Sequence, residues 1–553
     1  MLADSMKTPD WEKILPKFQL PGRYSGGEYS AYPNRENTIK FLLAFPDDYS
    51  IGMSSLGFHT VGNIVNLQPG FSCERVFAPA IDMEEWLRKE NYPLFSLESK
   101  RPAGSFDIIG FSMQYELSFT NFINMLELSK IEPRREDRQD CPLIMGGGPS
   151  FANPAALSAF FDIIILGEAE PVLPEVLSLY QKEKNDRNSF LLNAAAIEGV
   201  FVPGISKTAR YAIFKEFDNT YFPVSPPQAL TESAHARINL EINRGCRNRC
   251  RFCQASVIYS PYREKTVEKL MEVASASVAS TGYDEISLTS LSGTDHTEII
   301  RLLDELHYSF RSLGVSAVMS SMRPSHFASG LAARMARMRK GGITLAPETP
   351  SKKLQKVIGK NISSEEIISA AVEAARLGWK RIKLYFMIGL PGEDAEDIES
   401  IISFISLVKK SSGLTVSASI SPLVPQPHTP FQWVSAQDPD QLLQKAEYIR
   451  KKAPAKVSRF NKGQHIIVSI LSRADASLSE LLLAARKRGA RFDQWSEHFN
   501  FEIWEEAFRD IGSSWEEYYF REYKTSEVLP WDNVVLEVGR ESLLKAYQKA
   551  MEA

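Results

Sequence analysis

Cysteine is scarce in this sequence, with only five residues in 553. So few cysteines exclude the framework of disulfide bonds that stabilises many small secreted domains. The roles that remain for cysteine in a reducing compartment are core packing, metal binding and chemical reactivity. The scarcity therefore predicts a cytoplasmic protein, and it makes any local concentration of cysteine informative.

Long hydrophobic runs and a strong excess of one charge are also missing. The longest apolar stretches, such as FDIIILG and LLLAA, are far shorter than the roughly 18–20 residues that cross a bilayer. The first residues, MLADSMKTPDWEKILPK, lack the apolar core of a signal peptide. A net charge of −4 gives no general attraction to nucleic acid or lipid. We therefore expect no membrane partner.

Two series of short apolar strands alternate with helical stretches, and this alternation predicts α/β folds with parallel sheets. After an irregular lead-in at 1–38, the first series occupies residues 39–184. It predicts a doubly wound, Rossmann-like domain with the strands TIKFLLAFP, CERVFAP, FDIIGFSM, CPLIMGGG and FDIIILGE. Residues 185–232 are rich in turn formers and are expected to form a linker or small appendage.

The second series, at 233–435, contains six strand–helix units. It predicts a partial parallel barrel, (β/α)6, two units short of the complete eight-fold form. The region 436–553 is predicted to be mainly helical. Its last 63 residues hold four of the eight tryptophans, mixed with acidic residues at helical spacing. Aromatic residues in this pattern favour packing into a core.

Three of the five cysteines, Cys246, Cys250 and Cys253, lie together in EINRGCRNRCRFCQAS. They follow a predicted strand, so they occupy the loop at its carboxyl end, where parallel barrels carry active sites. A structural zinc site needs four ligands, and a second pair of zinc-type ligands is missing. Three thiolates can instead hold three corners of a 4Fe–4S cluster and leave one iron open. The spacing favours the open cluster, with zinc as the alternative.

The sequence CRNRCRFC, including Phe252, resembles the signature of the radical S-adenosylmethionine (SAM) superfamily. The resemblance implies that the three cysteines bind a 4Fe–4S cluster and that SAM chelates the fourth iron through its amino and carboxylate groups. It further implies that one electron, from a donor such as flavodoxin or ferredoxin, splits SAM into methionine and a deoxyadenosyl radical. That radical would abstract hydrogen from a substrate, while the protein positions the reactants and excludes water.

Other strand ends carry weaker matches to the same superfamily. TSLSGTD, SSMRP, APETPS and FMIGLPGED each follow a predicted strand of the second series. They resemble the turns that surround the methionine, ribose and adenine parts of SAM, and Glu348 is expected to meet the ribose hydroxyls or the amino group. The SAM-binding residues implied by the resemblance are Phe252, Ser292, Gly293, Ser320, Arg323, Glu348, Ile388 and Gly389.

The first domain resembles the cobalamin-binding domain that precedes the barrel in many radical SAM enzymes. Such domains typically bind cobalt through D-x-H-x-x-G, and the nearest stretch here is GFHTVG. His59 and Gly62 are in register, but Gly57 occupies the position of the aspartate that would orient the imidazole. His59 is therefore only a weak candidate for cobalamin. As a whole, the chain is most similar to an uncharacterised family of radical SAM proteins with such an N-terminal domain.

Three functions remain open at this point. The first is a radical SAM enzyme that acts on an unidentified substrate, with RNA or a protein as candidates. The second is a cobalamin-dependent radical SAM methyltransferase, and the third is a zinc-stabilised binding module without enzymatic activity. Cys73 and Cys141 are expected to be core thiols. The four arginines around the cysteine loop are expected either to tune a cluster or to pair with acids, and they are Arg244, Arg247, Arg249 and Arg251.

Overall fold

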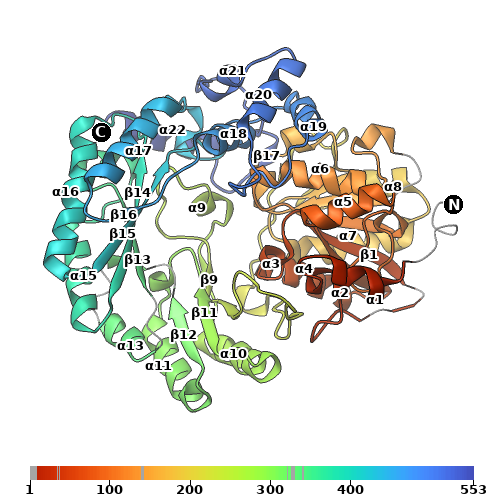
Figure 1. Cartoon of the computed structure of the whole chain (residues 1–553), viewed down its shortest axis with the longest axis horizontal. Coiled ribbons are helices and arrows are strands. Elements are labelled where there is room, and N and C mark those ends of the chain that lie inside the picture. The colour runs from red at the N-terminus through yellow and green to blue at the C-terminus, as the bar shows by residue number, and fades with distance from the viewer. Residues whose placement is uncertain are drawn as a thin grey trace. The chain divides into compact units, whose positions relative to one another are not determined.

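The computed structural model describes residues 9–33, 35–36, 38–138, 142–319, 322–324, 330–338 and 342–553. The chain forms two compact units (Figure 1). The N-terminal unit runs to Ala236 and also includes Ala474–Ser514 and Pro530–Val535. The C-terminal unit contains Arg237–Arg473, Trp515–Leu529 and Leu536–Ala553. The region expected as one helical tail is thus divided between the two units.

A doubly wound sheet forms the centre of the N-terminal unit, as the sequence predicts. Its strand order is β2-β1-β3-β4-β5-β6, and every pair is parallel except that of β5 with β6. The chain moves outward from β1 to β2 and then returns to the other side at β3, so the strand order reverses between β1 and β3. The strands are β1 Ile39–Phe45, β2 Phe71–Phe77, β3 Ile108–Ser112, β4 Leu143–Gly147, β5 Ile163–Ile165 and β6 Val200–Phe201.

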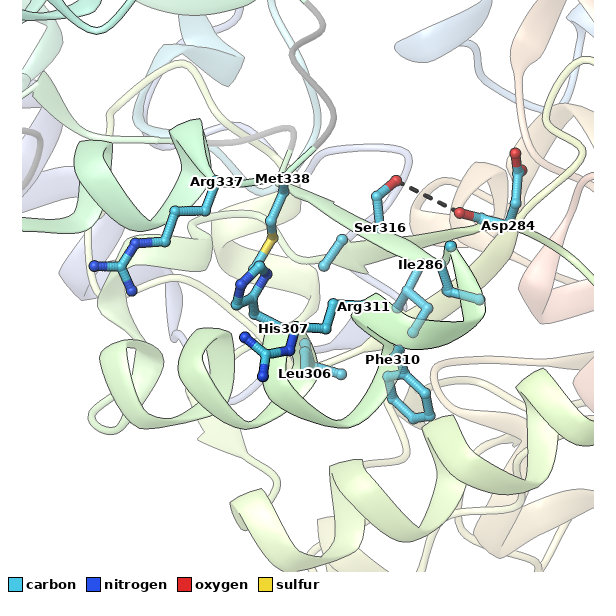
Figure 2. A pocket seen from close by; sticks show the side chains of 12 residues that line it. Asp284, Ile286, Leu306, His307, Phe310, Arg311, Ser316, Arg337 and Met338 are labelled. Carbon is cyan, nitrogen blue, oxygen red and sulfur yellow. Dashed lines mark hydrogen bonds between the residues drawn. The ribbon is translucent and has the colours of Figure 1, made fainter.

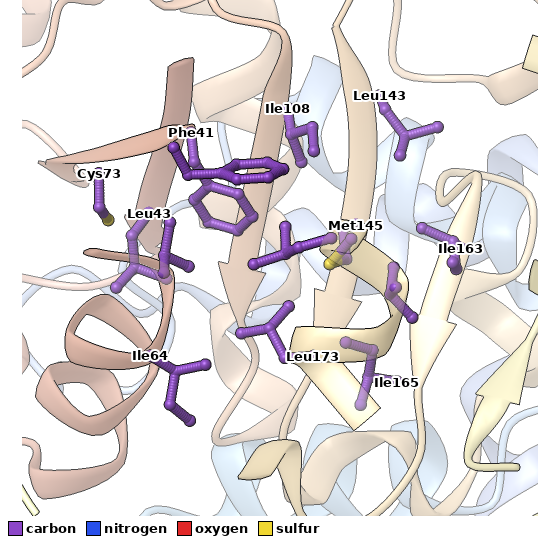
Figure 3. Packing of buried hydrophobic residues seen from close by; sticks show 14 of the residues in the cluster. Phe41, Leu43, Ile64, Cys73, Ile108, Leu143, Met145, Ile163, Ile165 and Leu173 are labelled. Carbon is purple, nitrogen blue, oxygen red and sulfur yellow. The ribbon is translucent and has the colours of Figure 1, made fainter. Parts of the chain in front are cut away.

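Both faces of this sheet are buried, which explains why its strands read as continuous apolar runs. On one face, Phe41 and Leu43 pack against helices α4 and α7, through residues such as Ile64 and Leu173 (Figure 3). On the other face, Phe111 meets Phe122 of α6 with 4.7 Å between ring centroids. The helices are α3 Tyr49–Gly52, α4 Leu56–Leu67, α5 Ile81–Lys89, α6 Phe119–Leu128, α7 Ala169–Glu183 and α8 Arg187–Ala194.

Segments outside the predicted domain complete the N-terminal unit. The lead-in contributes α1 (Trp11–Ile14) and α2 (Gly22–Ser25), and the expected linker contributes β6, which closes one edge of the sheet. From the end of the chain, α19 (Leu478–Lys487) packs against α6 and α20 (Phe501–Asp510). A short parallel pair joins β7 (Ala209–Arg210) to β17 (Val534–Val535). Sequence neighbours alone could not reveal these contacts.

The C-terminal unit contains the six predicted strand–helix units, arranged in two parallel sheets. Their orders are β12-β11-β8 and β13-β14-β15-β16. The strands are β8 Ile238–Glu241, β11 Glu285–Thr289, β12 Ser316–Met319, β13 Ile343–Glu348, β14 Arg381–Ile388, β15 Thr415–Pro422 and β16 Lys456–Val457. The helices between them are α10 Val267–Thr281, α11 Ile299–Phe310, α13 Ala332–Ala336, α14 Lys352–Ile358, α15 Ser364–Arg376, α16 Ala395–Ser412 and α17 Pro439–Lys452.

Alternation along β14 shows which side of the barrel wall is packed. Ile382, Leu384 and Phe386 are buried in one hydrophobic core with residues of α15 and α16, which lie outside the strands in Figure 1. The intervening Lys383 and Tyr385 point to the opposite, inner face and keep more exposure. The inner face of this wall is therefore polar and accessible. The unit is completed by α18 Lys462–Ser472, α21 Trp515–Tyr519 and α22 Arg540–Met551.

None of the helices that the structure describes is both long enough and apolar enough to cross a membrane.

Candidate active site

The three clustered cysteines lie on the loop that follows β8 and the short strand β9 (Asn243–Arg244). Cys246, Cys250 and Cys253 are all half-buried. The backbone N–H of Cys253 donates to the carbonyl of Cys250 at 3.0 Å, which makes a tight turn between the last two thiols. The short helix α9 (Ala255–Ile258) follows at once. The loop therefore lies at the carboxyl ends of the strands, as predicted.

Gly245 makes the turn into this loop possible. Its φ is +85°, in the left-handed region that favours glycine. A Cβ atom at this position would lie 2.7 Å from the carbonyl oxygen of Tyr259 and 2.8 Å from that of Pro261. Both distances are shorter than a normal contact, so no other residue fits without moving the backbone. The glycine places Cys246 at the start of the loop.

The surroundings of the thiols disfavour their ionised form. Burial is the largest of the causes that together raise the pKa of Cys250 to about 12; the ammonium of Lys360 acts in the opposite direction, and the thiols of Cys253 and Cys246 contribute to the rise. Burial likewise raises the pKa of Cys253. These thiols therefore stay protonated at neutral pH unless a bound metal holds them as thiolates.

The donor set suits a cluster better than a single ion. Within the described ranges, no three His, Cys, Asp or Glu side chains converge as the ligands of one metal ion would. Three cysteines that each bind a different iron need not converge on one point. The donor set of three closely spaced cysteine thiols fits a 4Fe–4S cluster.

One of the four arginines joins the cysteine loop to helix α14. The backbone N–H of Arg251 donates to Ile358 at 2.9 Å, and its guanidinium donates to the carbonyl oxygens of Lys356 at 2.6 Å and Val357 at 3.0 Å. These carbonyls belong to the last turn of α14, where a helix has unpaired acceptors and a partial negative charge. Arg251 therefore fixes the loop to this helix end.

The other arginines have different surroundings. Arg244 makes two hydrogen bonds to Glu241, at 3.0 and 2.8 Å, which is an ion pair at a strand end as expected. Arg247 stacks over the ring of Tyr262 at 4.3 Å and lies 3.9 Å from a carboxylate oxygen of Glu264. Arg249 is exposed. The arginines thus mainly hold the loop in place.

The turn after β11 lies against the cysteine loop. Ser292 and Gly293 are buried in this turn, and the Ser292 carbonyl accepts a hydrogen bond from Asn243 at 3.4 Å. The carboxylate of Asp295 accepts from the side chain of Asn248, which stands between Cys246 and Cys250, at 3.1 Å. Sequence reasoning missed Asp295, although an acidic residue just beyond a strand's carboxyl end is a recognisable signal.

The remaining predicted SAM residues differ in their surroundings. Phe252 is partly buried against the core that includes Leu354 of α14. The backbone N–H of Arg323 donates to the Thr294 hydroxyl at 3.3 Å. Ser320 lies outside the described residues. The structure therefore connects Arg323 to the turn after β11 and Phe252 to α14.

Two of the predicted SAM-binding residues, at the end of β14, have only backbone groups available to a ligand. The side chain of Ile388 is fully buried in the outer core, so it points away from the barrel interior. Gly389 has a φ of +79°, and its N–H donates to both carboxylate oxygens of Glu393 at 3.0 Å. The SAM contacts expected here stay a prediction, and they would have to be made by carbonyl groups.

Glu348 ends β13 and forms an ion pair with Lys360, with 2.7 Å between Nζ and Oε1. Lys360 was not among the residues predicted from the sequence. Because Arg251 of the cysteine loop binds the α14 carbonyls just before Lys360, the pair lies beside the cysteine loop. The loop, the turn after β11 and the Glu348–Lys360 pair are thus brought to one side of the barrel.

A separate pocket lies at the opposite ends of the strands. It has a volume of about 440 Å³ and is lined by Asp284 and Ser316, which precede or begin β11 and β12, together with His307, Arg311 and Arg337 (Figure 2). Parallel barrels carry their chemistry at the carboxyl ends of the strands, and this pocket is at the amino ends. We therefore place the candidate active site at the cysteine loop.

Comparison with known families decides what this loop belongs to. Residues 57–203 match the family described as radical SAM proteins, N-terminal, and residues 240–405 match the radical SAM superfamily. The chain belongs to the radical SAM superfamily. It is therefore an enzyme, and the family implies a 4Fe–4S cluster and SAM as its cofactors. The resemblance read from the cysteine loop is confirmed.

Individual relatives of this radical SAM protein extend the comparison. An uncharacterized protein of Methanocaldococcus jannaschii is 30% identical over 418 residues, which is 75% of this chain and 88% of that protein. Ribosomal protein uS12 methylthiotransferase RimO of Desulfotalea psychrophila is 30% identical over 195 residues, 31% of this chain and 42% of RimO. The radical SAM methyltransferase TsrM of Kitasatospora setae, solved with cobalamin and a 4Fe–4S cluster, covers 93% of this chain and 99% of its own, with 14% identity and a TM-score of 0.52. The likeness to TsrM shows the fold.

The sequence resemblance to a cobalamin-binding domain makes His59 the residue whose fit to that cofactor can be tested. Its side chain is enclosed in the N-terminal unit, with the residue only 4% exposed. Nε2 lies 2.9 Å from the carbonyl oxygen of Met53, and Nδ1 is buried without a hydrogen-bond partner. Burial lowers the pKa of His59 to about 4. An imidazole enclosed in this way does not fit the role of an axial ligand to a corrin.

The sheet edge where such a domain takes its ligand is occupied by the chain itself. Doubly wound sheets bind ligands at the carboxyl ends of the strands where the strand order reverses, here beside β1 and β3. Asp47, just after β1, accepts hydrogen bonds from Gln494 and from the indole N–H of Trp495, the latter at 3.0 Å. Asn121 of α6 donates to Pro46 at 3.0 Å and accepts from the N–H of Phe492 at 2.6 Å.

The same segment is held by a buried carboxylate. Asp493 accepts hydrogen bonds from the Thr120 hydroxyl at 2.5 Å and from the indole N–H of Trp504 at 3.2 Å. Burial raises the pKa of Asp493 to about 6. We call residues 491–495 the edge segment. Because it fills the ligand edge with paired polar groups, the N-terminal unit does not fit cobalamin in the manner that the sequence resemblance implies.

Proposed function

We propose that this radical SAM enzyme cleaves SAM reductively and uses the resulting radical to abstract hydrogen from a substrate. The observation that carries the proposal is the loop of Cys246, Cys250 and Cys253 at the carboxyl ends of the barrel strands. When bound there, a 4Fe–4S cluster supplies one electron to the C5′–S bond of SAM, which yields methionine and a deoxyadenosyl radical. An external one-electron donor, such as flavodoxin or ferredoxin, has to reduce the cluster first.

The residues of this chain provide the positioning for that reaction. Gly245 and Arg251 fix the cysteine loop, and the inner face of β14 provides a polar wall for the reacting molecules. On that wall, the ammonium of Lys383 lies 4.7 Å from the ring centre of Tyr385. A substrate that enters beside these groups would be close to the deoxyadenosyl radical, which would leave as deoxyadenosine after taking a hydrogen atom.

Two observations bear on whether the substrate is a protein or an RNA. RimO is named for its action on a ribosomal protein, which supports a protein substrate for this chain as one candidate. The stretch KKAPAKVSRFNKGQH at 451–465 has five Lys or Arg residues and no acid, a composition that could contact RNA phosphates. However, Lys462 pairs with Asp440 at 2.8 Å, and Arg459 lies 3.9 Å from Glu447. These intramolecular pairs reduce the charge available to phosphate. A protein is thus the better supported of the two.

Methylthiotransfer and cobalamin-dependent methyl transfer are two more specific reactions that radical SAM chemistry could serve here. Methylthiotransfer with a second cluster would need three further cysteines, and the sequence has only Cys73 and Cys141 left. Cys73 is fully buried in the core, where it pairs with Phe41 of the neighbouring strand (Figure 3). A cobalamin-dependent methyl transfer is supported by the fold of TsrM, but His59 and the edge segment speak against it. Radical formation from SAM is the step that all observations support.

The test is anaerobic purification with iron and sulfide, followed by addition of SAM and dithionite. We expect about four irons per chain and formation of deoxyadenosine. In Cys250→Ala the iron should fall strongly and deoxyadenosine should disappear. Cys73→Ala is the matched control, since it removes a thiol from the core and should leave both values unchanged. Formation of deoxyadenosine by Cys250→Ala, or zinc in place of iron in the wild type, would overturn the proposal.

A further inference from the structure

Lys360 is a half-buried cation beside the cysteine loop. Its side chain is 15% exposed, and that of its partner Glu348 is 13% exposed. Of the charges that act on the Cys250 thiol, Lys360 has the largest effect, followed by the two other cysteines. It also acts on Cys253. A lysine with little exposure normally has a partner that justifies its desolvation, and here the partner Glu348 cancels its charge in the absence of ligand.

The position of Lys360 is fixed by backbone contacts to the loop. Helix α14 ends at Gly359, whose φ of +65° reverses the chain direction. Arg251 binds the three carbonyl oxygens that immediately precede this glycine, those of Lys356, Val357 and Ile358. The cysteine loop and the base of Lys360 are thereby joined by hydrogen bonds. Lys360 therefore has a defined position relative to the cysteines.

Glu348 is held in an unusual backbone conformation. Its φ is +61°, and the register of β13 against β14 shifts between Leu345 and Glu348. A positive φ costs a residue other than glycine about 1–3 kcal/mol, and such residues concentrate at functional sites. Among the described residues of the C-terminal unit, only His428 shares this feature with Glu348. The conformation aims a carboxylate at Lys360 instead of continuing the strand.

We propose that Lys360 is a positioning residue for SAM, and that its ammonium binds the carboxylate of the methionine part. The inference rests on the proposed function and assigns one more contact within it. The methionine end of SAM carries an amino group and a carboxylate, and the Glu348–Lys360 pair presents the complementary carboxylate and ammonium. On binding, the SAM carboxylate replaces Glu348 as the partner of Lys360, and Glu348 becomes free to accept from the amino group or the ribose.

The charge balance at the loop supports this assignment. Three thiolates make the site negative, and a second carboxylate that approaches it is repelled. Arg244 is hydrogen-bonded to Glu241. Arg247 contacts Glu264 and Tyr262. The guanidinium of Arg251 is bound to the α14 carbonyls. Lys360 is paired with the single carboxylate of Glu348, and that partner can be exchanged for the carboxylate of SAM.

The experiment compares a ligand with the methionine carboxylate and one without it. S-adenosylhomocysteine and 5′-methylthioadenosine are titrated calorimetrically into the reconstituted enzyme and its variant Lys360→Met. Loss of a charge-assisted hydrogen bond should weaken S-adenosylhomocysteine by about 10- to 100-fold. Methylthioadenosine should change by less than about twofold, since it has no carboxylate to lose. Lys360→Arg should recover most of the affinity for S-adenosylhomocysteine.

Two variants keep the test independent of folding. Lys352→Met makes the same substitution at an exposed position at the start of α14, away from the carbonyls that Arg251 binds, and should leave both affinities unchanged. The double variant Glu348→Gln with Lys360→Met leaves no unpaired charge behind, and it should still lose affinity for S-adenosylhomocysteine. Equal losses for both ligands, or no loss for S-adenosylhomocysteine, would refute the role of Lys360. Failure of the wild type to bind iron or form deoxyadenosine would instead refute the proposed function.

Discussion

Replacing Gly245 with alanine gives the sharpest prediction, because the local geometry sets its size. A left-handed φ of +85° costs alanine about 1–2 kcal/mol. The new Cβ would also lie 2.7 and 2.8 Å from two backbone carbonyl oxygens, those of Tyr259 and Pro261. Relief of such overpacking costs a further 1–3 kcal/mol or so. The total, about 2–5 kcal/mol, is below the stability of most domains, so the protein should still fold.

The iron content is expected to respond far more than the fold. The carbonyls of Tyr259 and Pro261 lie in the segment that leads into β10 (Arg263–Glu264), which pairs with β9 directly before Gly245. The backbone has to shift by several tenths of an ångström to admit the methyl group, and Cys246 is the next residue. Metal–ligand distances tolerate only about 0.2 Å of error. We therefore expect Gly245→Ala to hold less than half of the wild-type iron after anaerobic reconstitution.

Gly413→Ala is the matched control. Gly413 has a φ of +69° at the end of α16, and a Cβ there would meet nothing within 4 Å. The variant Gly413→Ala should lose about 1–2 kcal/mol of folding stability through backbone strain alone, and it should retain its iron. Thermal unfolding and iron analysis of both variants give the answer. If Gly245→Ala retained full iron, the turn would not control the site, and if Gly413→Ala also lost iron, the effect would be one of stability alone.

Three further predictions concern the contact between Arg251 and α14 and two residues of the N-terminal unit. Arg251→Met should remove the hydrogen bonds to α14 and lower iron retention severalfold, whereas Arg249→Met, at an exposed position, should retain the wild-type iron. Equal iron in the two variants would show that the contact between Arg251 and α14 does not hold the cysteine loop. The pKa of Asp493 is raised by folding, so ionisation of this carboxyl opposes folding at any pH above its pKa in the unfolded chain, which is near 4. Between pH 4 and 7 the unfolding free energy of the wild type should therefore fall by about 2 kcal/mol relative to that of Asp493→Asn, measured by denaturant titration. Parallel pH profiles of the two proteins would contradict this prediction. His59→Ala and the wild type should both emerge without cobalamin absorbance after incubation with hydroxocobalamin and desalting, and retention by the wild type alone would reinstate His59 as a ligand.

The pattern of strands and helices was predictable because it depends on local periodicity. The periodicity of apolar residues predicts helices at 265–279, 363–377 and 394–410, and the structure has α10, α15 and α16 there, within two residues at each end. Caps visible in the sequence help to define these ends, such as the capping box of Ser363 with Glu366. The apolar runs of the first series likewise became a sheet buried on both faces.

The contacts between distant segments could not be predicted in this way. Arg251 and the carbonyls it binds are about 105 positions apart, and no local pattern marks that pairing. The Glu348–Lys360 pair spans 12 residues, but nothing in KKLQKVIGKN singles out its last lysine. The prediction that aromatic residues near the end form a core was useful, since Trp504 and Trp531 are fully buried. It gave no indication that Trp495 and its neighbours lie at the edge of the N-terminal sheet.

The edge segment shows why the same fold need not keep the same ligand. The resemblance to TsrM follows the backbone, which is shared at 14% identity, whereas a ligand site depends on which side chains fill the strand ends. Here Asp47, Asn121 and Thr120 could each have faced a ligand, and each is bound instead to the edge segment. Displacing that segment would break the hydrogen bonds that it makes with these three residues, each worth about 0.5–1.5 kcal/mol net. A ligand at this edge would therefore have to replace those hydrogen bonds before it gained any affinity.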